Sequence, residues 1–227
     1  MDEGQIKRHR IPGSSTDPAP LSRLTHYFSH RYPKRKSRLS GTVFRVGEAE
    51  RIQIARAFCG ATTGLHVLDV GCGDGEFLAN VLEGRPATLT LSDLSMDSLA
   101  TARETMRAHC ADIATVAGDF QSALPERQFD LVLAIGVLDY WQDWRHMLGQ
   151  LAVLTSGRLL ISMPPEGVPR HWLRRIWLAC QGVRLQTVSR DHLHLALAEA
   201  GLDGVLLRTR YEWFACVDLD PKEVRRE

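Results

Sequence analysis

Residues 67–77 read VLDVGCGDGEF, an apolar run that breaks into a series of glycines. Only Asp69 interrupts the apolar run, and glycines then occupy every second position, at Gly71, Gly73 and Gly75. Such a change is typical of a buried strand that ends in a tight loop before a helix. In an open parallel sheet, ligands bind beside the carboxyl ends of the strands. The stretch therefore predicts a ligand-binding loop.

The spacing and the charge of this loop both disfavour a phosphate ligand. The dinucleotide fingerprint is G-x-G-x-x-G, whereas this loop reads G-x-G-x-G, and no G-K-[ST] follows as a P-loop requires. Three acids, Asp69, Asp74 and Glu76, would repel a phosphate at short range. A ligand with a cationic sulfonium and an α-amino group would be attracted instead.

Short β-branched runs alternate with amphipathic helical patterns after residue 60, and Ser95 is the expected N-cap of the helical pattern at residues 95–110. We expect strands at residues 65–70, 87–93, 113–120, 129–137 and 157–165. Strands separated by helices form βαβ units, so the pattern predicts an α/β fold with a doubly wound, mostly parallel sheet. Residues 204–211 and 212–219 are separated only by a bend at Glu212 and predict an antiparallel C-terminal hairpin at one sheet edge.

The chain also divides into segments. Residues 1–20, rich in proline, glycine and serine, predict a flexible tail. Residues 21–60 predict an N-terminal cap of two helices, and residues 61–227 predict the core domain. An insertion near residues 164–190 is expected to cover the substrate.

This insertion contains a helical pattern with two possible roles. Trp172, Ile176 and Trp177 recur at helical spacing, so they either cover a substrate or pack on the sheet. We expect the neighbouring arginines, among them Arg174 and Arg175, to form a solvated face rather than an anion clamp.

Composition restricts the class of protein. The 227 residues are 44% hydrophobic and 24% charged, and no apolar run approaches the ~20 residues of a membrane helix. We see no secretion signal and expect a cytoplasmic protein. The five cysteines are scattered without a C-x-x-C pair, which disfavours a disulfide framework and a metal site. A net charge of +1 gives no global attraction to nucleic acid, although residues 7–10 and 34–38 are basic clusters.

With these motifs, the chain resembles the class I S-adenosylmethionine-dependent methyltransferases, whose first motif reads like VLDVGCGDG. The resemblance covers roughly residues 45–219 and implies a Rossmann-like fold with S-adenosylmethionine as cofactor. The glycine loop would then hold the methionine end of the cofactor.

The resemblance also implies contacts for the rest of the cofactor. Asp93, in LSDLS, would accept hydrogen bonds from both ribose hydroxyls, with Leu94 beside it. Asp119 and Phe120, in AGDF, would meet the adenine, and Ile135 would lie along the methionine part.

The N-terminal segment has a weaker similarity to magnesium-protoporphyrin O-methyltransferases, which share its YF start and a pair like LDY after the fourth strand. It implies that Tyr27, Tyr32 and Arg45 fold over the cofactor and that Arg45 pairs with its carboxylate. The predicted cofactor site comprises Asp69, Gly71, Gly73, Gly75, Asp93, Leu94, Asp119, Phe120, Ile135, Arg45 and Tyr32.

Candidate catalytic residues lie just past the fourth strand, in LDYWQDWRHM at residues 138–147. Tyr140, Asp139 and His146 are the titratable candidates for moving an acceptor proton. His146 alternatively belongs to the start of a packed or solvated helix. Methyltransferases that act on planar amide or base nitrogens often carry a [DNS]-P-P-[YF] loop after the fourth strand. This chain reads VLDY at that position, which disfavours DNA adenine and protein glutamine as acceptors.

We therefore expect an enzyme of small-molecule biosynthesis that methylates a small organic acceptor, first at oxygen, with nitrogen or carbon as alternatives. Membrane partners are not expected, nucleic acid is disfavoured, and a homodimer stays open. Two other functions remain. One is an RNA or protein methyltransferase that uses the basic N-terminal arm. The other is a non-catalytic binding subunit with the cofactor fold.

Overall fold

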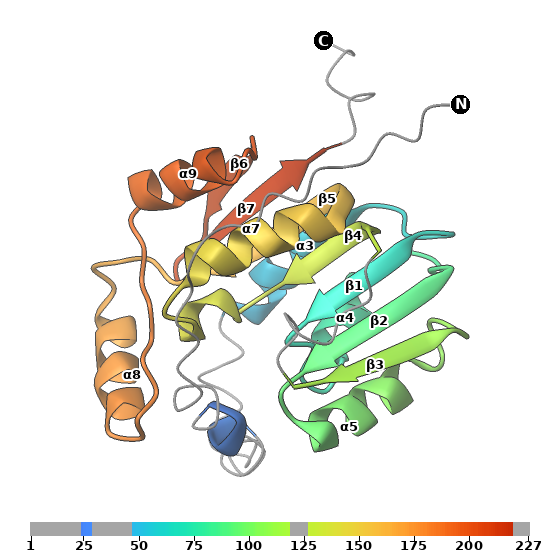
Figure 1. Ribbon diagram of the computed structural model, residues 1–227, viewed down its shortest axis with the longest axis horizontal. Helices are drawn as coiled ribbons and strands as arrows, with labels where there is room; N and C mark the ends of the chain where they lie inside the picture. Colours follow the sequence, from blue (N-terminus) through green and yellow to red (C-terminus); the bar gives the residue numbers. More distant parts are fainter. Residues whose placement is uncertain (1–23, 29–46, 119–126, 220–227) are drawn as a thin grey trace, which may run out of the picture.

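The computed structural model describes residues 24–28, 47–118 and 127–219, and it has a seven-stranded sheet with helices on both faces (Figure 1). The strands are β1 (His66–Val70), β2 (Thr88–Asp93), β3 (Ile113–Ala117), β4 (Phe129–Ala134), β5 (Thr155–Met163), β6 (Val205–Arg208) and β7 (Trp213–Asp218). The helices are α3 (Glu48–Cys59), α4 (Glu76–Val81), α5 (Met96–Met106), η2 (Leu138–Tyr140), α7 (Trp144–Leu154), α8 (Pro169–Ala179) and α9 (Arg190–Glu199). Residues 24–28 form a further helical segment.

The strand order is β3-β2-β1-β4-β5-β7-β6, which confirms the expected doubly wound sheet. Strands β1 to β5 pair in parallel, and Asp69 of the central strand β1 pairs with Leu91 of β2 and Leu133 of β4. Strand β7 pairs antiparallel with both β5 and β6, so the predicted C-terminal hairpin closes one edge. The order reverses beside β1, where such sheets bind ligands.

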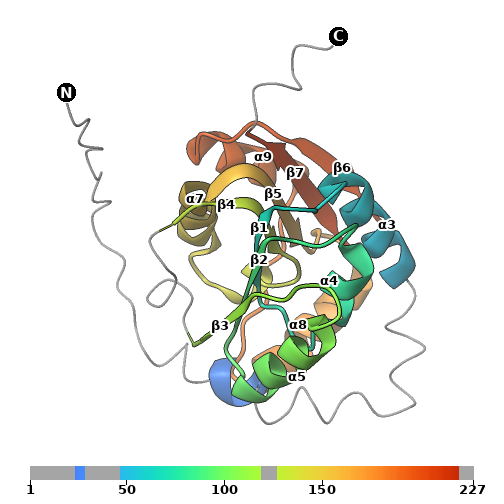
Figure 2. The ribbon, with the colours of Figure 1, turned by 90° about the vertical axis from the view of Figure 1, so that its right-hand side faces the viewer.

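Alternate residues of β1 pack on opposite faces of the sheet, as expected for a strand buried on both sides. Leu68 packs in one core cluster with Met147 of α7 and Leu193 of α9. Val67 packs in the other cluster with Leu99 of α5 and with residues of α3 and α4. Figure 2 shows α3, α4 and α5 on one side of the sheet and α7 on the other.

Two predicted strand boundaries shift for local reasons. Strand β4 ends at Ala134 rather than at residue 137, because Gly136 has a φ of 70° and η2 follows. Strand β5 ends at Met163, before two prolines that have no backbone N–H to donate. Both strands therefore end earlier than expected, and residues 135–137 and 164–165 belong to the segments that follow them.

Three of the described helices, α5, α7 and α9, begin after a residue whose side chain caps the helix. The predicted cap of α5 is present, because the Ser95 hydroxyl accepts the N–H of Ser98 at 3.3 Å. Asp143 caps α7 and Ser189 caps α9 in the same way, each accepting from the residue three positions on. Within the described ranges, no helix is long and apolar enough to cross a bilayer.

Replacing Ser189 by alanine should lower the free energy of unfolding by about 1 kcal/mol, because the His192 N–H loses its acceptor at 3.2 Å. Urea unfolding followed by circular dichroism measures this. Ser189→Asp is the matched control, since a carboxylate can also cap and should keep wild-type stability. Equal losses in both variants would contradict a capping role.

Candidate functional site

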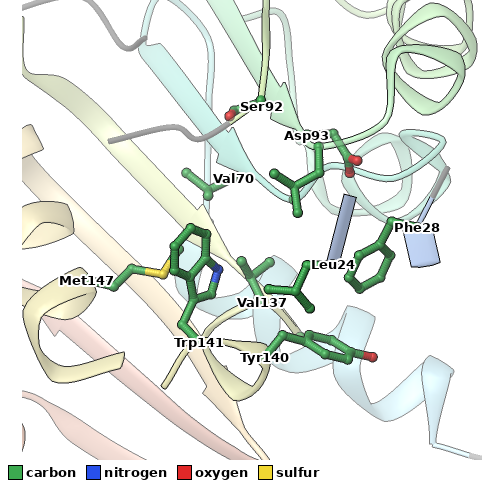
Figure 3. Close-up of a pocket in the computed structure, with 13 residues that line it drawn as sticks. Leu24, Phe28, Val70, Ser92, Asp93, Val137, Tyr140, Trp141 and Met147 are labelled. Carbon is green, nitrogen blue, oxygen red and sulfur yellow. The ribbon is translucent and has the colours of Figure 1, made fainter. Parts of the chain in front are cut away.

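A pocket opens at the carboxyl ends of β1, β2 and β4, with about 520 Å³ of empty space when the part open to solvent is included (Figure 3). Its lining is mostly apolar and comes from the glycine loop, the end of β2, the segment after β4 and the helical segment at residues 24–28. The lining residues are Leu24, Phe28, Val70, Gly71, Ser92, Asp93, Leu94, Gly118, Gly136, Val137, Tyr140, Trp141 and Met147. The structure thus brings the predicted Gly71, Asp93, Leu94 and Tyr140 into one pocket.

The glycine loop is held against the end of β2 by backbone hydrogen bonds. The N–H groups of Gly71 and Cys72 both donate to the Ser92 carbonyl, at 2.7 and 3.1 Å. Gly71 also has a φ of 71°, and a Cβ there would lie 2.3 Å from Cγ2 of Val137. The loop therefore needs glycine both for its backbone angle and for its contact with the segment after β4.

Asp93 is held by backbone donors while it faces the pocket. Its Oδ2 accepts the N–H of Gly73 at 3.0 Å, and its Oδ1 accepts the N–H of Ser95 at 2.8 Å. Burial raises the pKa of Asp93, and the backbone N–H groups of Ser95, Gly73 and Leu94 partly oppose that shift. Each carboxylate oxygen keeps acceptor capacity for a ligand hydroxyl.

Asp69 is buried, with 5% of its surface exposed, and it does not line the pocket. Burial, followed by repulsion from Asp93, raises the pKa of Asp69 to about 8. Two neighbouring carboxyl groups with raised pKa values favour a cation nearby, because a positive charge would stabilise their ionised forms. This agrees with the preference inferred from the acids of the loop.

The other cofactor residues have different positions. Ile135 packs against the core cluster that contains α3, α4 and α5, while its neighbour Gly136 lines the pocket and donates its N–H to the Ser162 hydroxyl at 2.9 Å. Gly73 and Gly75 complete the loop without lining the pocket. Four further predicted residues, Asp119, Phe120, Arg45 and Tyr32, lie outside the described residues.

Of the catalytic candidates, Tyr140 is the one that lines the pocket. Its ring meets Phe28 edge-on, with centroids 5.0 Å apart, and its hydroxyl accepts a hydrogen bond from Arg174 of α8. Asp139 is 1% exposed and lies behind it, with Oδ2 3.6 Å from Nη1 of Arg174. His146 sits on α7 with its ring 3.1 Å from Gln150, and it does not line the pocket. The three catalytic roles stay predictions.

Sequence patterns did not reveal a partly buried ionic cluster beside the pocket, in which only Asp139 is fully buried. Arg51 of α3 pairs with Glu212 of the β6–β7 turn at 2.8 Å, and Arg174 pairs with Asp139. Burial raises the pKa of Asp139, and Arg174 and then Arg51 oppose the shift. Burial lowers the pKa of Arg174, but Tyr140 and Asp139 more than offset this and leave it above its ordinary value.

Arg51 also reaches the pocket wall at the end of β4. A Cβ on Gly136 would lie only 3.6 Å from Nη2 of Arg51, so the guanidinium is next to the residue that borders the pocket there. This is a cation at the position where the resemblance puts the methionine part of the cofactor. Sequence patterns near Arg51 do not indicate this role, because its acidic partner Glu212 lies far away in the chain.

Comparison with known proteins agrees with this geometry. Residues 18–207 match a family described as methyltransferase domain. Magnesium protoporphyrin IX methyltransferase (ChlM) from Synechocystis PCC 6803, solved with bound SAH, superposes with a TM-score of 0.68 at 21% identity, covering 87% of this chain and 98% of that chain. The DhpI–SAH complex superposes with a TM-score of 0.66 at 16% identity, covering 89% and 98%.

A third structure, the N-methyltransferase NodS from Bradyrhizobium japonicum WM9 with S-adenosyl-L-homocysteine, gives a TM-score of 0.57 at 17% identity, covering 88% of this chain and 97% of that chain. At these identities the likeness concerns the fold. A search of curated proteins gives no significant match.

The raised pKa of Asp69 predicts a stability that depends on pH. The folded protein holds a proton on Asp69 up to about pH 8, whereas the unfolded chain releases it near pH 3.8. The folded state therefore binds more protons between these values, and the contribution of Asp69 to stability falls as pH rises through that window.

Urea unfolding at a series of pH values should show this trend as a difference between wild type and Asp69→Asn. The Asp69→Asn variant lacks the titration, so its stability relative to wild type should rise toward pH 8 and then level off. A constant difference across the window would show that Asp69 is ionised in the folded protein.

Proposed function

The chain belongs to the methyltransferase-domain family, and we propose that it transfers a methyl group from S-adenosylmethionine to an oxygen atom of a small organic acceptor. The family match covers most of the chain and confirms the expected class I methyltransferase and its enzymatic nature. The acceptor and its reacting atom belong to the proposal.

One observation supports the proposal: Asp93 and Tyr140 line one pocket, with Val137 between them in Figure 3. Gly71 and Gly136 also line this pocket. Asp93 is suited to the ribose diol, because its carboxylate is already fixed by backbone N–H groups. Leu94 and Gly118 provide an apolar wall for the adenine, to which Asp119 and Phe120 would add. Three solved structures with this fold hold S-adenosylmethionine or its demethylated form.

The methionine carboxylate would lie near Arg51. Its guanidinium borders Gly136 and is held in place by Glu212 at 2.8 Å. A hydrogen bond between a guanidinium and a carboxylate is charge-assisted and therefore stronger than a neutral one. Arg45, the sequence candidate for this role, would be a second donor to the same group.

The acceptor would occupy the end of the pocket formed by Tyr140, Phe28 and Trp141. Their rings suit an organic molecule with an apolar body. The guanidinium of Arg174 donates to the Tyr140 hydroxyl and also pairs with Asp139, so a cation and an anion both lie behind this end of the pocket. A neutral acceptor hydroxyl can both donate and accept a hydrogen bond there, which favours oxygen as the acceptor atom.

The cofactor supplies the chemistry, since its sulfonium carries an activated methyl group. The chain aligns the acceptor with that group and keeps water out, which can account for most of the rate in such a displacement. Tyr140 would orient the acceptor oxygen, because a phenol hydroxyl can both donate and accept a hydrogen bond.

The alternatives gain no support from the described residues. The basic clusters at residues 7–10 and 34–38, which an RNA or protein methyltransferase would use, lie outside them. A non-catalytic subunit would not need an acceptor pocket with a hydrogen-bonded tyrosine next to the cofactor site.

A methyl-transfer assay with radiolabelled S-adenosylmethionine tests the proposal on a panel of phenols, carboxylic acids and amines. We expect transfer to an oxygen acceptor and a large loss with Asp93→Ala, whose cofactor affinity in isothermal titration should fall at least about tenfold because two hydrogen bonds to the ribose are lost. Asp97→Ala, on the exposed first turn of α5, is the control and should behave as wild type.

Two results would count against this function. Label that enters only RNA or protein in a cell extract would favour a macromolecular acceptor. Wild-type protein that gives no heat with S-adenosylmethionine would contradict the cofactor site itself.

Arg51→Ala should weaken S-adenosylmethionine binding about tenfold or more, since a charge-assisted hydrogen bond contributes roughly 1.5–3 kcal/mol. Arg103→Ala, an exposed arginine on α5, is the matched control. Because Arg51 also pairs with Glu212, Glu212→Gln should be measured in parallel. If Glu212→Gln weakens binding as much as Arg51→Ala, the arginine acts through the fold and not through the cofactor.

A further inference from the structure

Helix α8 turns polar side chains toward the protein. His171 is 5% exposed, and its Nε2 donates to the Tyr211 carbonyl at 2.7 Å. Arg174 faces the same way and binds Asp139 and Tyr140. Together with the buried Leu178, these residues fix which side of α8 faces the pocket. This corrects the expectation of a solvated face that includes Arg174.

The opposite side of α8 carries large apolar side chains in solvent. Trp172 is 63% exposed, Leu173 62%, Ile176 47% and Trp177 43%. At ~100° per residue they form one continuous band, which we call the apolar strip of α8. A surface helix normally directs its apolar side to the core, so α8 has the reverse orientation. Trp172 and Ile176 thus neither line the pocket nor pack on the sheet.

Positive charge surrounds the apolar strip of α8. Residues 168–190 contain no acid and five arginines, of which Arg174 is turned inward to Asp139, in a chain whose net charge is only +1. By helical geometry, Arg170 and Arg175 lie along the two edges of the strip. Arg184, in the loop after the helix, is also exposed. The strip is therefore apolar in the middle and cationic at its borders.

This charge selects among the possible occupants. A second copy of the chain, docked by the same surface, would bring arginines against arginines. The N-terminal residues 29–46 contain six Lys or Arg and no acid, so they would be repelled as well. RNA would match the charge but offers no apolar layer for Leu173 and Ile176. A surface with anionic groups above an apolar layer matches both features.

We propose that the apolar strip of α8 binds the surface of a membrane containing anionic lipid, with the helix lying in the plane of the interface. The tryptophans would enter the boundary between headgroups and acyl chains, where indole rings are favoured. Arg175 and Arg184 would contact lipid phosphates, whereas the Arg170 guanidinium stacks on the Tyr211 ring at 4.6 Å. A peripheral contact of this kind requires no spanning segment, and it reverses the expectation that membrane partners are absent.

Co-sedimentation of the full chain with vesicles tests this proposal. Vesicles of equal parts phosphatidylglycerol and phosphatidylcholine should bind the protein, with a blue shift of tryptophan emission, while pure phosphatidylcholine should bind it much less. The Trp172→Asp/Leu173→Asp double variant should bind at least about tenfold more weakly, since two large apolar side chains stay in water. Arg175→Ala should bind about fivefold more weakly to the anionic vesicles only.

Val153→Asp is the matched control, because Val153 is 72% exposed on α7 and lies outside the strip. It should bind vesicles as the wild type does, and thermal unfolding should show that all variants fold. Absence of wild-type binding to anionic vesicles would overturn the proposal. So would a dimer in sedimentation that the double variant abolishes, or vesicle binding that the double variant retains.

Discussion

A single carbonyl, that of Ser92 at the end of β2, accepts the backbone N–H groups of both Gly71 and Cys72. This bond pulls the turn after β1 across to the neighbouring strand, and it brings the Gly73 N–H to Asp93. In this position Gly71 lies so close to Val137, in the segment after β4, that a side chain at position 71 would collide with it. Three strand ends thereby meet at one point, and the pocket is the space that they leave.

Charges are distributed unevenly around that space. On the β2 side, Asp69 and Asp93 are carboxyl groups with no cationic side chain among the described residues to balance them, and burial raises both pKa values. On the opposite side, Asp139 and Glu212 are balanced by Arg174 and Arg51. A ligand with a positive centre suits the first side, because a positive charge stabilises the ionised form of its carboxyl groups. A terminal carboxylate suits the second side, where a guanidinium can donate a charge-assisted hydrogen bond to it.

The sequence predicted the parts of the fold that depend on local pattern. The strand and glycine loop around residues 67–77, the Ser95 cap and the hairpin at the Glu212 bend each follow from residues close together in the chain. Asp93 came instead from the resemblance to the class I methyltransferases, which assigns a role to the acid at the end of the second strand.

Long-range pairs could not be predicted in this way. Periodicity in α8 shows which residues share a face, but not whether that face is turned inward. A helix face with arginine and histidine is normally expected to be exposed to solvent. Arg174 is nevertheless turned inward, because it binds Asp139 and Tyr140 on a different element. The pairing of Arg51 with Glu212 joins α3 to the β6–β7 turn and is also invisible to local reasoning.

The two sides of α8 interleave along a helix of 11 residues: inward His171, Arg174 and Leu178 alternate with outward Trp172, Leu173 and Ile176. An insertion of one residue within it would rotate everything beyond by ~100° and exchange parts of the two sets. Natural variation in this helix should therefore be tolerant of substitution on its outer side but intolerant of a change in length. Homologous chains could thus differ in the partners that bind the outer side of α8 while keeping the contacts of Arg174 with Asp139 and Tyr140.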